Sequence, residues 1–243
     1  MMSQFGYITA RETEIIRILR VLSEATDSFV VVGGYAVNAH GQHRFSVDCN
    51  LATDRDNVPV IDATLLGEGY TLARSEVRPP IGVTIREYHK SVGGERASVE
   101  LLVDTVVNTT TRGIWTYGFI QSNSVEAIVK GATDSTPARV ARKNLLVAMK
   151  LHAGKTQDSE DVVMLSEGTD WKTVAKCAAS GSKEQLIRQI DYAIGEISSP
   201  RFASDLKSTF AIRSDATPLT KRAIFGLNTL RMLLVAEKFK DSL

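Results

Sequence analysis

The sequence predicts an α/β domain over residues 1–135, followed by an α-helical domain over residues 136–243. In the first part, short apolar runs alternate with glycine turns, and the clearest example is Val30-Val31-Val32 followed by Gly33-Gly34. After Thr136-Pro137, apolar residues recur almost only at helical spacing. The boundary between the two parts is either a hinge or a loop over a shared core.

The first part begins with a helix and continues with short strands. Thr9 and Glu12 form a candidate capping box, and the apolar residues after them predict a helix from 10 to 25. Gly93-Gly94 predicts a hairpin between two later strands. The other expected elements are a strand at 29–32, a turn and short helix at 33–39, a strand at 45–52, a helix at 58–66, strands near 70–73, 82–90 and 97–103, an extended piece near 115–120 and a short helix at 125–130.

The second part is predicted to be helical from its first residues. Pro137 suits the first turn of a helix, with Thr136 as its N-cap. The expected helices run over 137–153, 158–166, 170–180, 183–198, 201–211 and 218–240.

Composition predicts a soluble cytoplasmic protein with no membrane partner. Charged residues make up 23% of the chain, and no apolar run approaches the roughly 20 residues of a membrane span. Cys49 and Cys177 lack metal-binding spacing and are expected to be reduced thiols. The net charge of +1 gives no global preference for nucleic acid, so any basic surface must be local.

Polar side chains interrupt two of the predicted strands. Asp48 and Asn50 alternate with apolar residues, so they point to one face, about 7 Å apart along the strand. Glu100 lies among apolar neighbours in a later strand, where a carboxylate needs a partner. If the two strands are adjacent, these three side chains supply the oxygen ligands that Mg²⁺ prefers. The alternative is that Glu100 belongs to an exposed edge strand. The Gly33-Gly34 turn offers backbone N–H groups to phosphate.

Four blocks in this order resemble the nucleotidyltransferase superfamily, and more closely its abortive-infection and toxin branch (AbiEii-like and MenT-like proteins). The resemblance covers roughly residues 29 to 165. The blocks are the turn Gly33-Gly34-Tyr35-Ala36, His40-Gly41 with Arg44, the segment Asp48-Cys49-Asn50, and the apolar strand that carries Glu100. A later helix that contains Lys150 and a polar segment from Lys155 to Asp161 are also similar to this branch.

The resemblance implies a nucleotidyltransferase-like mixed sheet with an α-helical C-terminal domain and the active cleft between them. It implies transfer of a nucleotidyl group from a nucleoside triphosphate (NTP) to an acceptor, RNA or tRNA included, with Mg²⁺ as cofactor. It further implies the toxin role of a toxin–antitoxin or phage-defence pair, with an antitoxin protein as partner. The implied roles are Asp48, Asn50 and Glu100 for metal and catalysis, with Glu100 as metal ligand or general base, and Gly33, Gly34, Arg44, Lys150 and Asp158 for nucleotide binding.

Asn50 departs from the family pattern, which has aspartate at this position. An amide oxygen can bind Mg²⁺, but the site loses one negative charge. Loss of one preorganised electrostatic contact costs about 10²–10³ in rate elsewhere. Three explanations stay open: a weak enzyme, a degenerate protein that binds nucleotide or a partner without catalysis, and an introduced inactivating substitution.

A basic stripe is predicted on the helix expected from Pro137. At 100° per residue, Arg139, Lys143 and Lys150 fall close together on one face. Such a face suits triphosphate or an RNA backbone, or it is simply solvated. Asp158 and Asp161 either position Lys150 or Lys155, or are first-turn acids favoured by the helix dipole.

Overall fold

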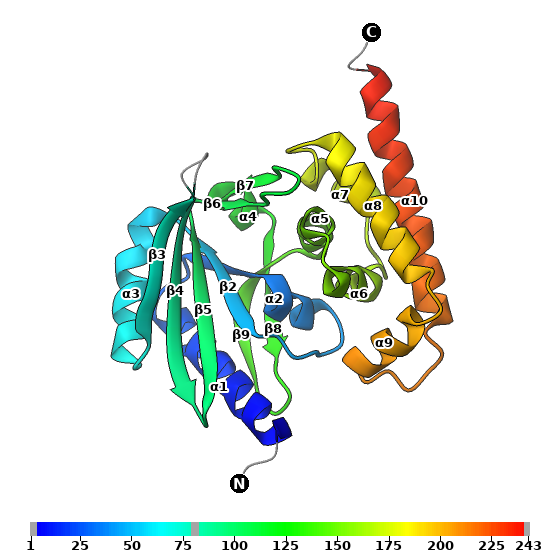
Figure 1. The fold of residues 1–243 in the computed structure, drawn as a ribbon. Helices are drawn as coiled ribbons and strands as arrows, with labels where there is room; N and C mark the ends of the chain where they lie inside the picture. The colour runs from blue at the N-terminus through cyan, green and yellow to red at the C-terminus, as the bar shows by residue number, and fades with distance from the viewer. Residues whose placement is uncertain (1–3, 79–82, 241–243) are drawn as a thin grey trace. The chain divides into compact units, whose positions relative to one another are not determined.

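A computed structural model describes residues 4–78 and 83–240 of the chain (Figure 1). The backbone divides into two compact units. The first comprises Met1–Val106 and Trp115–Arg142, and the second comprises Val107–Ile114 and Lys143–Leu243.

The first unit is built on a mixed sheet, which confirms the predicted α/β character of this part of the chain. In the described residues the sheet has seven strands, in the order β3-β4-β5-β2-β1-β9-β8. The pairs β1/β9 and β2/β5 are parallel, and the other neighbouring strands are antiparallel. The strands are β1 (Phe29–Val32), β2 (Asp48–Thr53), β3 (Thr71–Arg78), β4 (Val83–Val92), β5 (Glu95–Val103), β8 (Ser124–Lys130) and β9 (Ser135–Ala141).

Helices α1 (Gln4–Ala25) and α3 (Val58–Gly67) cover one face of this sheet (Figure 1). Two side-chain contacts identify the face: Lys90 of β4 pairs with Glu14 of α1 at 2.9 Å, and Arg86 of β4 pairs with Asp62 of α3. Strand side chains alternate between the two faces of a sheet. Every second residue of β4 counted from Arg86, together with its register partners on β5 and β2, therefore also faces the helices. They form the buried core of the unit, which includes Tyr88, Val99, Leu101, Cys49 and Leu51.

The β4–β5 hairpin forms at the predicted glycine pair. Gly93 and Gly94 have φ of 60° and 91°, the left-handed values that a two-residue hairpin turn requires of both positions. Residue 82, the first of the predicted strand, lies outside the described part of the chain. The remaining elements around the sheet are α2 (Gly33–His40), η1 (Arg55–Asn57), α4 (Tyr117–Ser122) and a small second sheet of β6 (Thr105–Val107) and β7 (Ile114–Thr116).

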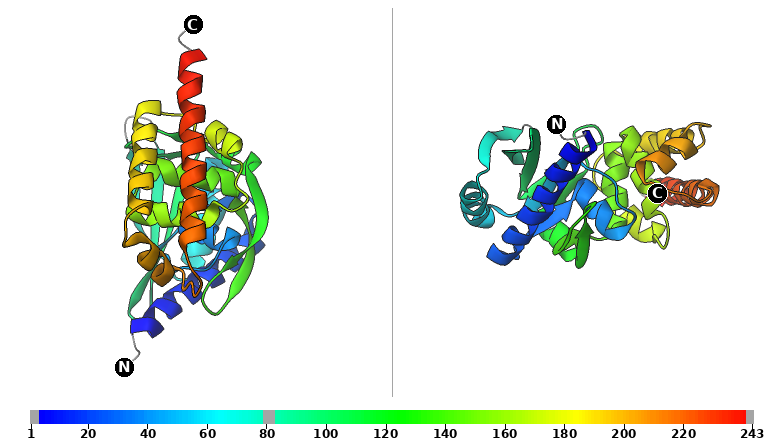
Figure 2. Two further views of the ribbon diagram at one scale, coloured as in Figure 1. Left: turned by 90° about the vertical axis from the view of Figure 1, so that its right-hand side faces the viewer. Right: turned by 90° about the horizontal axis from the view of Figure 1, so that it is seen from below.

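The second unit is helical, as predicted. In it, α8 (Lys183–Ile197) and α10 (Thr217–Lys240) run side by side in opposite directions (Figure 2). An ion pair of 2.7 Å between Arg231 and Asp191 links them. The other helices are α5 (Lys143–Ala153), α6 (Thr156–Leu165), α7 (Trp171–Cys177) and α9 (Phe202–Thr209).

Two predicted helical segments are strands, and this corrects the sequence-based assignment. Residues 125–130 lie in β8, and the first residues of the predicted helix 137–153 lie in β9. Arg139 is therefore on a strand, whereas Lys143 and Lys150 are on α5, so the predicted basic stripe along one helix is wrong. Thr136, expected as an N-cap, is a buried strand residue.

The predicted capping box at Thr9 and Glu12 is also wrong. Helix α1 begins at Gln4, so both residues lie inside it. Glu12 is buried and uses its carboxylate in tertiary contacts, with His43 at 2.7 Å and with the backbone N–H of Ala132 at 2.6 Å. Among the described residues, no helix is both long and apolar enough to cross a membrane.

Candidate functional site

The glycine turn, Gly33-Gly34, lies where β1 ends and α2 begins. Gly33 has φ of 67°, a left-handed value that side chains disfavour. A Cβ on Gly33 would lie 2.7 Å from Oδ1 of Asn50. A Cβ on Gly34 would collide with Oγ of Ser46 and lie 3.2 Å from Nη2 of Arg44. Both glycines are therefore required by close packing of the turn against its neighbours.

The first turn of α2 keeps its backbone donors available to a ligand. The N-cap position is occupied by Val32, and no side chain of the described residues caps the helix there. Free N–H groups at a helix N-terminus, together with the helix dipole, favour an anion. Arg44 adds a guanidinium beside Gly34, and this side chain is only 3% exposed.

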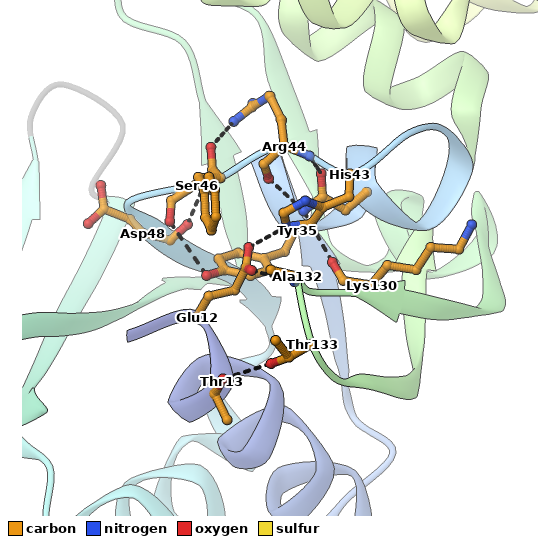
Figure 3. A network of polar contacts seen from close by, with 12 residues as sticks. Glu12, Thr13, Tyr35, His43, Arg44, Ser46, Asp48, Lys130, Ala132 and Thr133 are labelled. Atoms are coloured by element: carbon orange, nitrogen blue, oxygen red, sulfur yellow. Dashed lines mark hydrogen bonds and ion pairs between the residues drawn. The ribbon is translucent and has the colours of Figure 1, made fainter. Parts of the chain in front are cut away.

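The segment between α2 and β2 is fixed by several hydrogen bonds (Figure 3). Asn38 donates to the carbonyl of Arg44 at 2.9 Å and accepts from its N–H at 3.1 Å. His43 contacts Glu12, and Nη1 of Arg44 donates to the carbonyl of Phe45 at 3.0 Å. These contacts hold Arg44 and Ser46 next to the glycine turn. In Figure 3 the carboxylate of Asp48 points away from this network.

Asp48, Asn50 and Glu100 lie on one face of adjacent strands. Strand β2 pairs in parallel with β5, and Asn50 is the register partner of Glu100. Glu100 therefore belongs to an interior strand, not to an edge. Nδ2 of Asn50 donates to Oε2 of Glu100 at 2.6 Å. Asp48 is exposed, while Asn50 and Glu100 are half-buried. This is the face opposite to α1 and α3, because Asn50 and Glu100 alternate with the buried Cys49, Leu51, Val99 and Leu101.

The orientation of the Asn50 amide determines which oxygen atoms of Asp48, Asn50 and Glu100 are available to bind a cation. An ionised carboxylate only accepts hydrogen bonds, so the amide nitrogen faces Glu100 and the amide oxygen faces Gly33. Asp48 and Glu100 supply carboxylate oxygens. Mg²⁺ commonly binds one or two protein carboxylates and completes its shell with substrate phosphates and water. The residues present therefore fit one Mg²⁺ held by Asp48 and Glu100. The described residues contain no group of three or more His, Cys, Asp or Glu side chains placed to hold a metal alone.

Two cross-strand rows of polar residues cover this face. In the Glu100 row, Asn50, Glu100 and Glu87 are register partners on β2, β5 and β4. In the Ser98 row, the partners are Asp48, Ser98 and His89 on the same strands. Sequence reasoning missed Glu87 and His89, although their spacing of two in a predicted strand was a usable signal. Only the register of β4 against β5 places them beside Glu100.

Lys150 and Asp158 are brought together within the second unit. Nζ of Lys150 lies 2.7 Å from Asp158 and 2.8 Å from Asp161. The lysine side chain is 12% exposed and Asp161 is fully buried. Burial by itself lowers the pKa of Lys150, but the two aspartates outweigh it, so its pKa is raised. Asp158 also accepts from the N–H of Lys155 at 3.0 Å at the start of α6.

A separate cavity of about 190 Å³ lies elsewhere in the first unit. It opens near the start of β1 and the end of α1, and its lining includes Asp27, Glu126 and Arg139. The glycine turn follows the other end of β1, so this cavity is not part of the Asp48–Glu100 site.

Two solved structures from Helicobacter pylori share this fold over almost the whole chain. A candidate nucleotidyltransferase matches with a TM-score of 0.51 and 13% identity, over 97% of this chain and 98% of that chain. JHP933 matches with a TM-score of 0.51 and 12% identity, over 100% of this chain and 98% of that chain. No family model and no curated protein sequence matches the chain. The fold is nucleotidyltransferase-like, as predicted, and membership of the abortive-infection and toxin branch stays a prediction.

Proposed function

We propose that this protein transfers a nucleotidyl group from an NTP to an acceptor hydroxyl, with one Mg²⁺ at Asp48 and Glu100. The observation that carries the proposal is the placement of a tightly packed glycine turn, with free helix N–H groups and a buried arginine, beside two carboxylates on one sheet face. The nucleotidyltransferase-like fold supports it.

Each part of the site has a separate task in this proposal. The α2 N-terminus and Arg44 hold the phosphates, because backbone N–H groups and a guanidinium both bind phosphate oxygens. Asp48 and Glu100 hold the cation, which when bound would neutralise charge on the triphosphate and leaving pyrophosphate. Asn50 fixes the Glu100 carboxylate through its 2.6 Å hydrogen bond.

RNA or tRNA is the proposed acceptor, and the toxin component of a toxin–antitoxin or phage-defence pair is the proposed biological role. Both come from the sequence resemblance. The basic helix face that first favoured RNA is not formed, because Arg139 lies on β9. Lys150 was predicted to steady the triphosphate. Its two buried ion pairs give it a structural role within the second unit, so any contact with nucleotide would be additional.

A transfer assay tests the proposal. The purified chain is incubated with each labelled NTP, Mg²⁺ and total tRNA, and both labelled RNA and released pyrophosphate are measured. Asn50→Asp is run beside the unsubstituted chain, and Asp48→Asn serves as the control that removes a cation ligand. Label transfer that disappears in Asp48→Asn supports the proposal. Absence of RNA label and of pyrophosphate in both the unsubstituted and Asn50→Asp chains, with both folded, would reject it.

A second candidate function is nucleotide binding without catalysis. The observation that favours it is the Asn50–Glu100 hydrogen bond, which joins two positions that both face the cation in the family pattern. Calorimetry with the four NTPs, with and without Mg²⁺, separates the two candidates. Binding that is independent of Mg²⁺ and unaffected by Asp48→Asn supports the binding protein, and Mg²⁺-dependent binding supports the enzyme.

A further inference from the structure

Glu87 and His89 form a hydrogen-bonded pair on the polar face of the sheet. Nε2 of His89 lies 2.6 Å from Oε1 of Glu87, and both side chains are about one-fifth to one-quarter exposed. They alternate with Arg86 and Tyr88, which contact α3 on the opposite face. The pair therefore shares its face with Asp48, Asn50 and Glu100, although the predicted site did not include it.

The register of β4 brings two carboxylates into direct cross-strand opposition. Glu87 is the partner of Glu100, and such pairs have Cβ atoms about 5 Å apart. Like charges at this spacing are unfavourable unless each has its own donor or cation. Here Asn50 donates to Glu100 and His89 contacts Glu87. The Asn50–Glu100 and His89–Glu87 pairs therefore lie next to each other on one face of the sheet.

The tautomer of His89 follows from its partner. Nε2 of His89 lies within hydrogen-bond distance of the Glu87 carboxylate. Carboxylate oxygens accept hydrogen bonds, so Nε2 of His89 is the donor to Glu87, and Nδ1 is the ring nitrogen left to accept a proton. A carboxylate that orients an imidazole in this way is a common arrangement for proton abstraction.

The in-line geometry of nucleotidyl transfer defines the side from which the acceptor approaches. This step rests on the proposed function. In that function the glycine turn beside β1 would hold the leaving pyrophosphate, and the α-phosphate would lie next to Asp48 and Glu100 on β2 and β5. An attacking oxygen must lie opposite the leaving oxygen. The next strand in that direction is β4, which carries Glu87 and His89.

Ser98 gives an independent indication of a polar ligand on this side. It lies between Asp48 and His89 in the Ser98 row and is 1% exposed. Its Oγ is buried and has no hydrogen-bond partner among the described residues. A buried hydroxyl without a partner is costly, so such groups usually have a ligand or water to bond.

We propose that His89, oriented by Glu87, is the general base for the acceptor. In this step Nδ1 of His89 takes the proton of the acceptor hydroxyl, and the acceptor oxygen forms a bond to the α-phosphorus. The bond between the α-phosphorus and its bridging oxygen to the β-phosphate breaks, and pyrophosphate leaves with that electron pair. Glu87 stabilises the imidazolium, which afterwards returns its proton to solvent. Glu100, held by Asn50, then serves as a cation ligand and not as the base.

The test compares His89→Gln, His89→Ala and Glu87→Gln in whichever chain transfers label, the one with Asn50 or Asn50→Asp. Ser91→Ala, an exposed position on the same strand, is the matched control. We expect His89→Gln to lower kcat by about 10²-fold or more with little change in NTP affinity by calorimetry. Added imidazole should partly restore His89→Ala, and Glu87→Gln should lower kcat without changing NTP affinity.

Three outcomes overturn the inference. One is transfer by His89→Gln at the unsubstituted rate. Another is loss of NTP binding in parallel with kcat, without imidazole rescue, which indicates a structural role for His89. The third is absence of transfer and of pyrophosphate release from both the unsubstituted and Asn50→Asp chains, which rejects the proposed function and this inference together. Transfer with an unaffected His89→Gln rejects the inference alone.

Discussion

Asn50 and Glu100 are register partners on parallel strands, and Nδ2 of Asn50 donates to Oε2 of Glu100 at 2.6 Å. An aspartate at position 50 would place two carboxylates at this contact. Two such charges about 4 Å apart repel by about 4 kcal/mol at an effective dielectric constant of about 20, before any relaxation. The amide at position 50 therefore avoids this repulsion when no cation is bound.

The first prediction concerns the cation dependence of stability in Asn50→Asp. Without divalent cation, we expect this variant to unfold at a lower temperature than the unsubstituted chain, because the introduced carboxylate repels Glu100. Mg²⁺ or Mn²⁺ should restore the loss. Thermal unfolding in EDTA and in a Mg²⁺ series measures it. Asn228→Asp, an exposed position on α10, controls for the added charge. Equal unfolding temperatures of both variants in EDTA would contradict the prediction.

The second prediction concerns the packing of the glycine turn. Gly34→Ala should destabilise the protein by about 1–3 kcal/mol and weaken NTP binding, because the new methyl group overlaps Ser46. Removing the obstructing side chain should relieve this, so Gly34→Ala with Ser46→Gly is expected to recover most of the loss. Urea unfolding and calorimetry with NTP measure both effects. If the double variant is no more stable than Gly34→Ala alone, steric overlap with Ser46 is not the cause.

The third prediction concerns the buried ion triplet of the second unit. Lys150→Met should cost about 3–5 kcal/mol, because it leaves Asp158 and Asp161 buried without their cation. The pKa of Lys150 is raised in the folded protein. Its contribution to the free energy of unfolding is therefore complete below the usual lysine pKa of 10.5, and it is lost as pH rises through the raised pKa. The difference in unfolding free energy between the two chains should be constant from about pH 7 to about pH 10. Exposed Lys172→Met is the control and should change little.

The fourth prediction concerns acid sensitivity at His152. Burial lowers the pKa of His152 to about 4, against a usual value of 6.5. Oγ1 of Thr111 lies 2.6 Å from Nδ1, and Nε2 donates to the carbonyl of Ala178 at 3.2 Å, so the neutral ring is satisfied. Because the unfolded chain binds the proton more readily, stability falls as pH is lowered from 6.5 to about 4.

The expected loss from His152 is up to about 3 kcal/mol over this range. Urea unfolding at several pH values should show a smaller pH dependence of the unfolding free energy for His152→Gln than for the unsubstituted chain. The comparison between the two slopes matters, because other groups titrate in both chains. Identical slopes would show that His152 protonates equally in the folded and unfolded states.

Local sequence pattern correctly predicted the features that depend on a single helix, strand or turn. The apolar run before Gly33-Gly34, the alternation at Asp48 and Asn50, and the two glycines of the β4–β5 hairpin each correspond to observed structure. The helices of the second unit from α6 onward begin and end within a few residues of their predicted limits. Each of these features depends on neighbouring residues in sequence.

Pairing between segments far apart in the chain determined secondary structure that local sequence pattern did not predict. Residues 135–141 carry Thr136-Pro137, which suits a helix start, yet they form β9 because Val140 pairs with Val31 and the buried Thr136, Ala138 and Val140 alternate. Pro137 precedes the pairing with β1 and is exposed, so its missing N–H is tolerated there.

Local sequence pattern was enough to predict the glycine turn, the strand positions of Asp48, Asn50 and Glu100, and the helical character of the second unit. Three features required the folded structure: Asn50 donates to Glu100, Glu87 and His89 lie on the same face, and Arg139 is on a strand. The physical reason is that register and strand order are set by burial and hydrogen bonding between segments far apart in the chain, which local periodicity does not encode.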